Sequence, residues 1–115
     1  MKFKLIVAIT GEKWTNDLVA AARDAGATGA TIIGHAKGEG LDPLKTFLGA
    51  SLRTSTDLIF FLVEEHMCRT IIEAIDNAGH MDEKYTGIAF LLDVEDAVGV
   101  SHQIEELTPL VEEQI

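Results

Sequence analysis

The sequence predicts an α+β fold in which an antiparallel four-stranded sheet carries two helices on one face. Apolar runs rich in β-branched residues alternate along the 115-residue chain with segments of helical periodicity. The order is strand, helix, strand, long connection, strand, helix, strand. No repeat or linker divides the chain, and its length suits one domain. These elements fit the ferredoxin-like βαββαβ arrangement over residues 1–115.

Four segments have the composition of strands: residues 3–9, 29–36, 55–65 and 86–94. The first ends at Thr10 and Gly11, which favour the end of a strand. The run from Leu58 to Val63 is apolar without interruption, so it is predicted to be a central strand covered on both faces.

Two segments, residues 15–27 and 66–79, have apolar residues at helical spacing. In the first, Thr15 or Asn16 is predicted to cap the N-terminus, and Gly26 to adopt the left-handed conformation at the C-terminus. The second is predicted to end at Gly79. The residues after 94 leave room for a short fifth strand or for a terminal helix interrupted near Pro109.

With both helices on one face of the sheet, the other face is left uncovered. Phe60, Leu62, Phe90 and Leu92 are predicted to point that way. An apolar patch of this size needs a partner on a soluble protein, and a closed ring of identical chains supplies one. The sequence therefore predicts an oligomer.

The charge of the chain excludes some partners and is unevenly distributed. The formal net charge is −10, which opposes binding to nucleic acid or to an anionic membrane surface. Residues 93–115 carry seven acidic residues and no lysine or arginine, so the C-terminal region, about 95–115, is strongly acidic. Residues 34–53 carry three basic residues against two acidic ones. This mildly basic loop is where the sequence predicts that a small anion binds.

The sequence also disfavours membrane-inserted, secreted, metal-binding and catalytic proteins. No apolar run is long enough to span a bilayer, and the N-terminus does not resemble a signal peptide, so a cytoplasmic protein without membrane insertion is expected. Its one cysteine, Cys68, agrees with a reducing compartment. The four histidines lack ligand spacing, so no metal site is predicted. No nucleophile is paired with a base, and we expect no catalytic activity.

Several motifs together resemble the PII signal-transduction proteins. They are "GATGAT" before the second strand, "GEG" at residues 38–40 in the long loop, and "TGIAFLLDVEDAVGV" after the second helix, in the same element order. The resemblance covers nearly the whole chain. It implies a homotrimer that binds adenine nucleotides between neighbouring subunits. It also implies that the loop, about 37–54, acts as the family's T-loop and regulates a client protein, with a membrane transporter as one candidate.

The loop itself holds four predicted ligand-binding residues. Gly38 and Gly40 allow backbone N–H groups to approach phosphate oxygens, and Lys37 supplies positive charge. Arg53, at the foot of the loop, can donate two hydrogen bonds to a phosphate or a bicarbonate.

The resemblance implies four more ligand-binding residues. Thr31 matches the threonine of the second strand whose hydroxyl meets the adenine edge. Gly87 falls in the family's B-loop, the second side of the cleft, and Lys84 and Thr86 lie beside it.

Three cations of the family's site are missing from this chain. Ile88 follows Gly87 where the family has a lysine, and the two arginines expected after the fourth strand are absent. Each charge-assisted hydrogen bond contributes about 1.5–3 kcal/mol, so AMP or ADP is favoured over ATP as the effector. Two alternatives stay open: a CutA-like metal-associated trimer, and an ACT-like module that binds small molecules.

Overall fold

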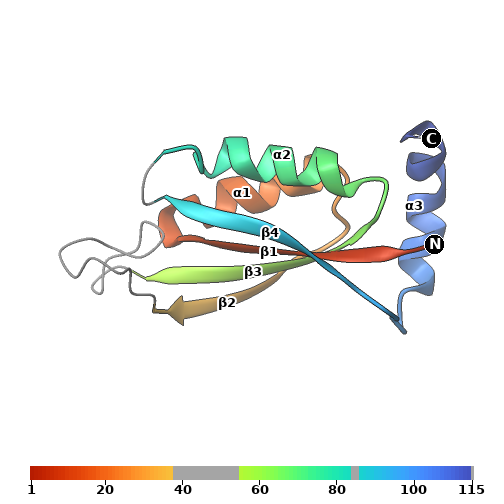
Figure 1. Ribbon diagram of the computed structural model, residues 1–115, viewed down its shortest axis with the longest axis horizontal. Helices are drawn as coiled ribbons and strands as arrows, with labels where there is room; N and C mark the ends of the chain where they lie inside the picture. The colour runs from red at the N-terminus through yellow and green to blue at the C-terminus, as the bar shows by residue number, and fades with distance from the viewer. Residues whose placement is uncertain (38–54, 84–85, 115) are drawn as a thin grey trace.

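The computed structural model describes residues 1–37, 55–83 and 86–114 (Figure 1). Apart from Lys37, the predicted loop over about 37–54 lies outside this part of the chain. The elements in chain order are β1 (Phe3–Gly11), α1 (Glu12–Asp24), β2 (Thr31–Ala36), β3 (Thr56–Glu64), α2 (Cys68–Ala78), β4 (Gly87–Asp93) and α3 (Ser101–Gln114).

The four strands form one antiparallel sheet in the order β2-β3-β1-β4. Helices α1 and α2 lie side by side on the same face of this sheet (Figure 1). The predicted ferredoxin-like fold is therefore confirmed. The uninterrupted apolar run of β3 is central, as expected, because β3 pairs with β1 on one side and β2 on the other.

The core lies between the sheet and the two helices. Residues of β1 and β3 alternate between the two faces, and those on the helix side are almost fully buried. They pack against one apolar stripe from each helix. The centre of this core consists of Ile6, Ala8, Ile59 and Phe61 from the strands and Leu18, Ala22, Ile71 and Ile75 from the helices.

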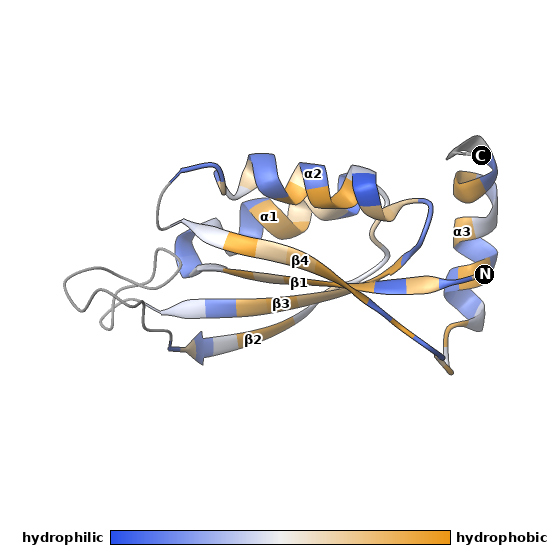
Figure 2. Cartoon of the chain, viewed as in Figure 1, coloured by the Kyte–Doolittle hydropathy of each residue, from blue (hydrophilic) through white to orange (hydrophobic). Residues whose placement is uncertain are grey.

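The other side of the sheet, here called the open face, is also apolar. Directly paired residues share a face, so the register puts residues of all four strands on it, including Thr31 and the buried pair Phe3 and Glu64. Its other apolar residues are Leu5, Val7 and Ile9; Leu58, Phe60 and Leu62; Ile88, Phe90 and Leu92; and Ile33. Figure 2 shows the hydrophobic colouring of these strands. The expected coverage of β3 on both faces is not met within one chain, because Leu58, Phe60 and Leu62 remain partly exposed on the open face.

Both predicted helix starts need correction. Helix α1 begins at Glu12, directly after β1, with Gly11 as its N-cap. The predicted caps Thr15 and Asn16 therefore lie inside the helix, and Thr15 is buried. Helix α2 begins at Cys68, two residues later than the predicted segment.

The helix ends are closer to expectation. Gly26, just beyond the C-terminus of α1, has a positive φ of 120°, as the sequence predicted. Gly79 does follow α2, but its φ is −89°, and the next residue, His80, has the positive φ of 51°.

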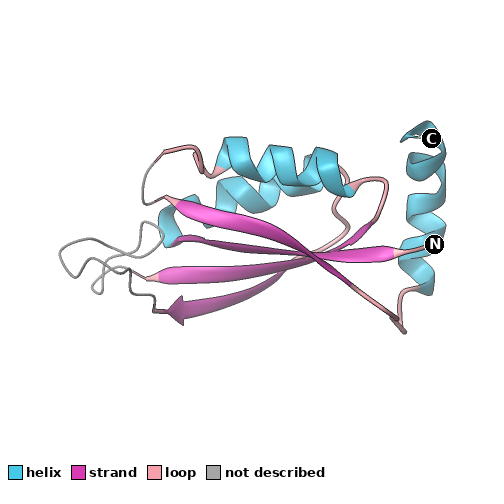
Figure 3. Cartoon of the chain, in the orientation of Figure 1, coloured by secondary structure: helices cyan, strands magenta, loops and turns pink. Residues whose placement is uncertain are grey.

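The C-terminal residues form a helix rather than a fifth strand (Figure 3). Pro109 lies inside α3 without ending it. Leu107 and Val111, one turn apart, are buried and join the core, with Val100 and Ile104 packed against it. The hydroxyl of Thr28, before β2, lies 3.0 Å from the side-chain oxygen of Gln103. Helix α3 is thus held to the end of the sheet opposite the long loop (Figure 1).

Candidate functional site

The strand ends that border the long loop lie together at one end of the sheet, here called the loop end. Ala36 pairs with Thr56, Thr56 pairs with Gly11, and Gly87 pairs with Thr10. The ends of β2 and β1 therefore meet the beginnings of β3 and β4. Any ligand held by the root of the loop binds at this end.

Four of the eight predicted ligand-binding residues are described by the structure. Gly38, Gly40, Arg53 and Lys84 lie outside the described residues. Lys37 directly follows β2 and is exposed. Thr31 begins β2 and is paired with Phe60, so it belongs to the open face, and it is also exposed.

Thr86 lies just before β4, the outer strand on the other edge of the sheet from β2, and its hydroxyl contacts the turn that follows α2. Its hydroxyl oxygen lies 2.6 Å from the carbonyl oxygen of His80 and 3.0 Å from that of Glu83. The ring of His80 packs on Trp14 of α1, with 4.6 Å between the ring centroids. The Thr86 hydroxyl therefore orders the turn, a role that its position in the sequence did not reveal.

Gly87 is required by packing between strands. A Cβ at this position would lie 2.5 Å from the carbonyl oxygen of Ile9 and 3.4 Å from the Cα of Thr10. No side chain fits at 2.5 Å from a backbone atom without a shift of one of the strands. Gly87 thus lets β4 begin close against β1.

The described site residues fall on opposite edges of the sheet. Thr31 and Lys37 belong to β2 and its end, whereas Thr86 and Gly87 belong to the beginning of β4. Strands β3 and β1 lie between them, so three strand spacings of about 4.8 Å separate the two groups. One chain cannot bring both groups onto one small ligand, but the edges of two neighbouring chains can.

One cavity of about 310 Å³ lies beside Gly87, between α2 and β4. Its charged lining residues are Arg69, Glu73 and Asp76, and Arg69 donates a hydrogen bond to Glu73 at 2.9 Å. The lining is therefore net negative. This cavity of the single chain does not suit a phosphate group.

Sequence reasoning missed a buried polar cluster at the loop end. The Thr15 hydroxyl donates a 2.6 Å hydrogen bond to the buried carboxylate of Asp57. The hydroxyls of Thr10 and Thr56 are buried and have no hydrogen-bond partner among the described residues. Thr15 and Asp57 are 42 residues apart, and no local pattern signals such a contact.

The end of β2 is irregular at the point where the loop begins. The register with β3 shifts between Ile33 and Ala36, and His35 within this stretch has a φ of 62°. An extra residue of this kind is a β-bulge, which re-aims the strand. The bulge sets the direction in which Lys37 leaves the sheet.

Comparison with known protein families gives one decisive match. The family model described as "Nitrogen regulatory protein P-II" matches residues 3–103. This chain belongs to the P-II family. Membership makes it a signal-transduction protein of that family, and the match favours this family over the CutA-like and ACT-like alternatives.

Solved structures support the P-II fold. One similar structure is that of CPII bound to ADP, AMP and acetate, from Thiomonas intermedia K12. It has a TM-score of 0.67 and 18% sequence identity, and the match covers 87% of this chain and 96% of that chain. No curated protein matches the sequence. Among the described residues of this P-II chain, no helix has the length and apolar character needed to cross a bilayer.

Proposed function

We propose that this P-II protein is a homotrimeric, non-catalytic sensor of an adenine nucleotide. The nucleotide binds in the clefts between neighbouring subunits at the loop end of the sheet. Its binding shifts the conformations of the segment over about 37–54, and this changes the affinity for a client protein. The protein acts in the cytoplasm, and one candidate client is a membrane transporter.

The observation that carries the proposal is the placement of the site residues on opposite edges of one sheet. Lys37 and Gly87 lie at the same end of the sheet but on its two outer strands. A ring of chains brings the β2 edge of one subunit next to the β4 edge of its neighbour. The open face gives such a ring its apolar interior, because residues from all four strands contribute to it.

The nature of the effector follows from the comparison and from the charge. CPII, which shares the fold, was solved with ADP and AMP. In this chain, residues 93–115 contain no lysine or arginine, and Ile88 follows Gly87. A nucleotide with fewer phosphates needs fewer cations, so AMP and ADP bind more tightly than ATP.

The proposal is tested by calorimetric titration of the purified protein with AMP, ADP and ATP. The wild type should bind at least one of AMP and ADP, and more tightly than ATP. Lys37→Gln should weaken this binding about tenfold, because it removes one charge-assisted contact. Lys2→Gln is the matched control. Lys2 is an exposed lysine that precedes β1, at the end of the sheet away from the loop, and its loss should leave the affinity unchanged.

Two outcomes would contradict the proposal. Absence of heat and of thermal stabilisation with all three nucleotides would exclude an adenine effector. If Lys37→Gln and Lys2→Gln lost the same amount of nucleotide affinity, the cause would be a general effect of charge rather than a site at the loop end.

A further inference from the structure

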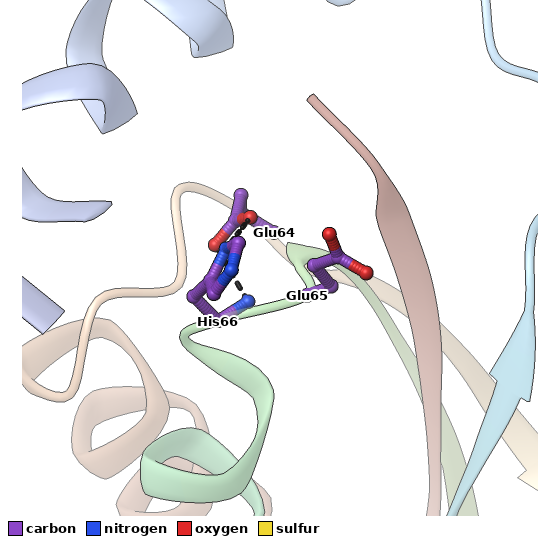
Figure 4. Close-up of side chains that lie close together, drawn as sticks. All are labelled: Glu64, Glu65 and His66. Carbon is purple, nitrogen blue, oxygen red and sulfur yellow. Dashed lines mark hydrogen bonds and ion pairs between the residues drawn. The ribbon is translucent and has the colours of Figure 1, made fainter. Parts of the chain in front are cut away.

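The end of the sheet opposite the loop end carries three metal-ligating side chains in succession. Glu64 ends β3, and Glu65 and His66 lead toward α2. Each of the three residues has one ligand atom that lies within 4.8 Å of those of the other two. Figure 4 shows Glu64 against the His66 ring, with Glu65 beside them. The prediction of no metal site relied on spacing between histidines and so passed over this run.

The Glu64 side chain is only 1% exposed, and a glutamate is unusual at so buried a position. One carboxylate oxygen accepts a 2.7 Å hydrogen bond from the backbone N–H of His66, and the other lies 2.6 Å from its ring Nδ1. No lysine or arginine among the described residues forms an ion pair with Glu64. A buried carboxylate is costly unless a positive group balances it.

His66 and Glu65 connect this buried carboxylate to the solvent. The His66 side chain is 45% exposed, and Glu65 is half-buried. The pKa of Lys4 is raised chiefly by Asp93 and least by Glu65, and its amino group lies 2.8 Å from the Asp93 carboxylate. An ion from solution therefore reaches His66 and Glu65 first, and the amino group of Lys4 is engaged with Asp93.

We propose that Glu64, Glu65 and His66 bind a divalent transition-metal cation of the zinc class. Carboxylate oxygen and imidazole nitrogen are ligands that Zn²⁺ accepts, with one water completing a four-coordinate site. Ligands about 2.1 Å from a tetrahedral ion lie about 3.4 Å from one another. The three donor atoms already lie within 4.8 Å of one another, so side-chain rotation alone is needed to reach that spacing. The cation lies between the Glu64 carboxylate and the His66 Nδ1, which are now 2.6 Å apart.

This site differs from the proposed nucleotide cleft in position and in ligand. It joins the end of β3 to the beginning of α2, whereas the cleft lies at the loop end. A cation bound only by the folded chain stabilises that chain. Binding of zinc can therefore be tested without nucleotide, and its outcome is independent of the nucleotide titrations.

The test is titration of the untagged, nucleotide-free protein with Zn²⁺, followed by calorimetry and by thermal unfolding. We expect one Zn²⁺ per chain and a higher unfolding temperature with Zn²⁺ than without it. His66→Ala and Glu65→Gln should each weaken binding at least tenfold and abolish the thermal shift. His102→Ala is the matched control, because His102 is an exposed histidine in the first turn of α3 and should not affect binding.

Glu64→Gln tests the buried ligand. If this variant keeps the wild-type circular dichroism and mass, it should lose Zn²⁺ binding as well; if it does not fold, His66→Ala and Glu65→Gln decide the question. The proposal is overturned if the wild type shows no saturable binding, or if His66→Ala binds Zn²⁺ as the wild type does. It would also be overturned if His102→Ala lost as much Zn²⁺ affinity as His66→Ala.

Discussion

A Cβ on Gly87 would come within 2.5 Å of the carbonyl oxygen of Ile9, in the neighbouring strand. The obstacle is backbone, which cannot rotate away as a flexible side chain can. Gly87→Ala should therefore lower the free energy of unfolding by about 1–3 kcal/mol. The matched control is Gly29→Ala, since a Cβ on Gly29 meets nothing within 4 Å. Denaturant unfolding of both variants checks this prediction, and equal stabilities would contradict it.

Two buried threonines at the loop end should respond in opposite directions to the same substitution. The Thr15 hydroxyl donates to the buried Asp57 carboxylate, whereas the Thr10 hydroxyl has no partner in the part of the chain that the structure describes. Thr15→Val leaves this buried carboxylate without its donor and should cost about 1.5–3 kcal/mol. Thr10→Val removes an unsatisfied group and should be neutral or stabilising. A loss of stability in Thr10→Val as large as in Thr15→Val would disprove this assignment.

The same residues explain where sequence reasoning failed. Threonine is a common N-cap residue, so the sequence alone favoured Thr15 as the N-cap of the first helix. Its hydroxyl is used instead by Asp57 of β3, a contact between distant parts of the chain, so α1 extends back to Glu12. The tertiary hydrogen bond to Asp57 thus outweighs the preference of Thr15 for the N-cap position.

At the scale of elements, the strands and helices were predicted well because hydrophobic periodicity determines them. The order of the elements along the chain, the central position of β3 and the open face all followed from apolar spacing in the sequence. The C-terminal segment did not, because Pro109 argues against a helix interior. Helix α3 forms nonetheless, since Leu107 and Val111 bury their side chains against the core on either side of the proline.

Helix α3 should therefore contribute to stability through its buried stripe. Leu107 is 1% exposed and Leu110 is 39% exposed on the same helix. Leu107→Ala should cost about 2–5 kcal/mol, and Leu110→Ala should change stability by less than about 0.5 kcal/mol. Unfolding is compared at one protein concentration, because assembly would make stability depend on it. Similar losses in the two variants would mean that α3 does not pack as described.

The ion pair between Lys4 of β1 and Asp93 of β4 should make a small, pH-dependent contribution to the free energy of unfolding. The hydrogen bond and charge of Lys4 lower the pKa of Asp93, and those of Asp93 raise the pKa of Lys4. Because the pKa of Asp93 is lower in the folded chain, the pair stabilises at neutral pH, and that contribution is lost as the pH falls through this lowered value. The raised pKa of Lys4 means a corresponding loss when strongly alkaline pH passes through it.

Asp93→Asn should accordingly lower the unfolding temperature slightly at neutral pH and low salt. The difference from the wild type should vanish in 1 M NaCl, since Asp93 is exposed and Lys4 is partly exposed, and it should shrink on acidification. Asp82→Asn is the control, because Asp82 is exposed and no ion pair of it occurs among the described residues. A difference that persisted in high salt would contradict the electrostatic explanation.

At the scale of the whole molecule, the sequence resemblance indicated which residues belong to the candidate site, and the sheet order shows why they need a second chain. Thr31 and Gly87 are 56 positions apart in a sequence that gives no strand order by itself. Only the order β2-β3-β1-β4 reveals that their strands are the two outer ones. The proposed site is thus incomplete in the single chain, and the proposed function therefore makes nucleotide binding depend on assembly.

The open face provides the test of that connection. Phe90 lies on it beside Val7, which is 7% exposed although it is not part of the core under the helices. A charge at position 90 would have to be buried without a partner if three copies close over this face. Phe90→Glu should therefore convert a trimer, measured by light scattering after gel filtration, into single chains that no longer bind AMP or ADP.

Val98→Glu separates this effect from that of added charge alone. Val98 is 91% exposed in the segment before α3, so a glutamate there should leave both the mass and the nucleotide affinity unchanged. A wild type with the mass of one chain would refute the trimer. A trimeric Phe90→Glu would mean that the chains meet through another surface, because an unpaired carboxylate inside an apolar interface costs several kcal/mol.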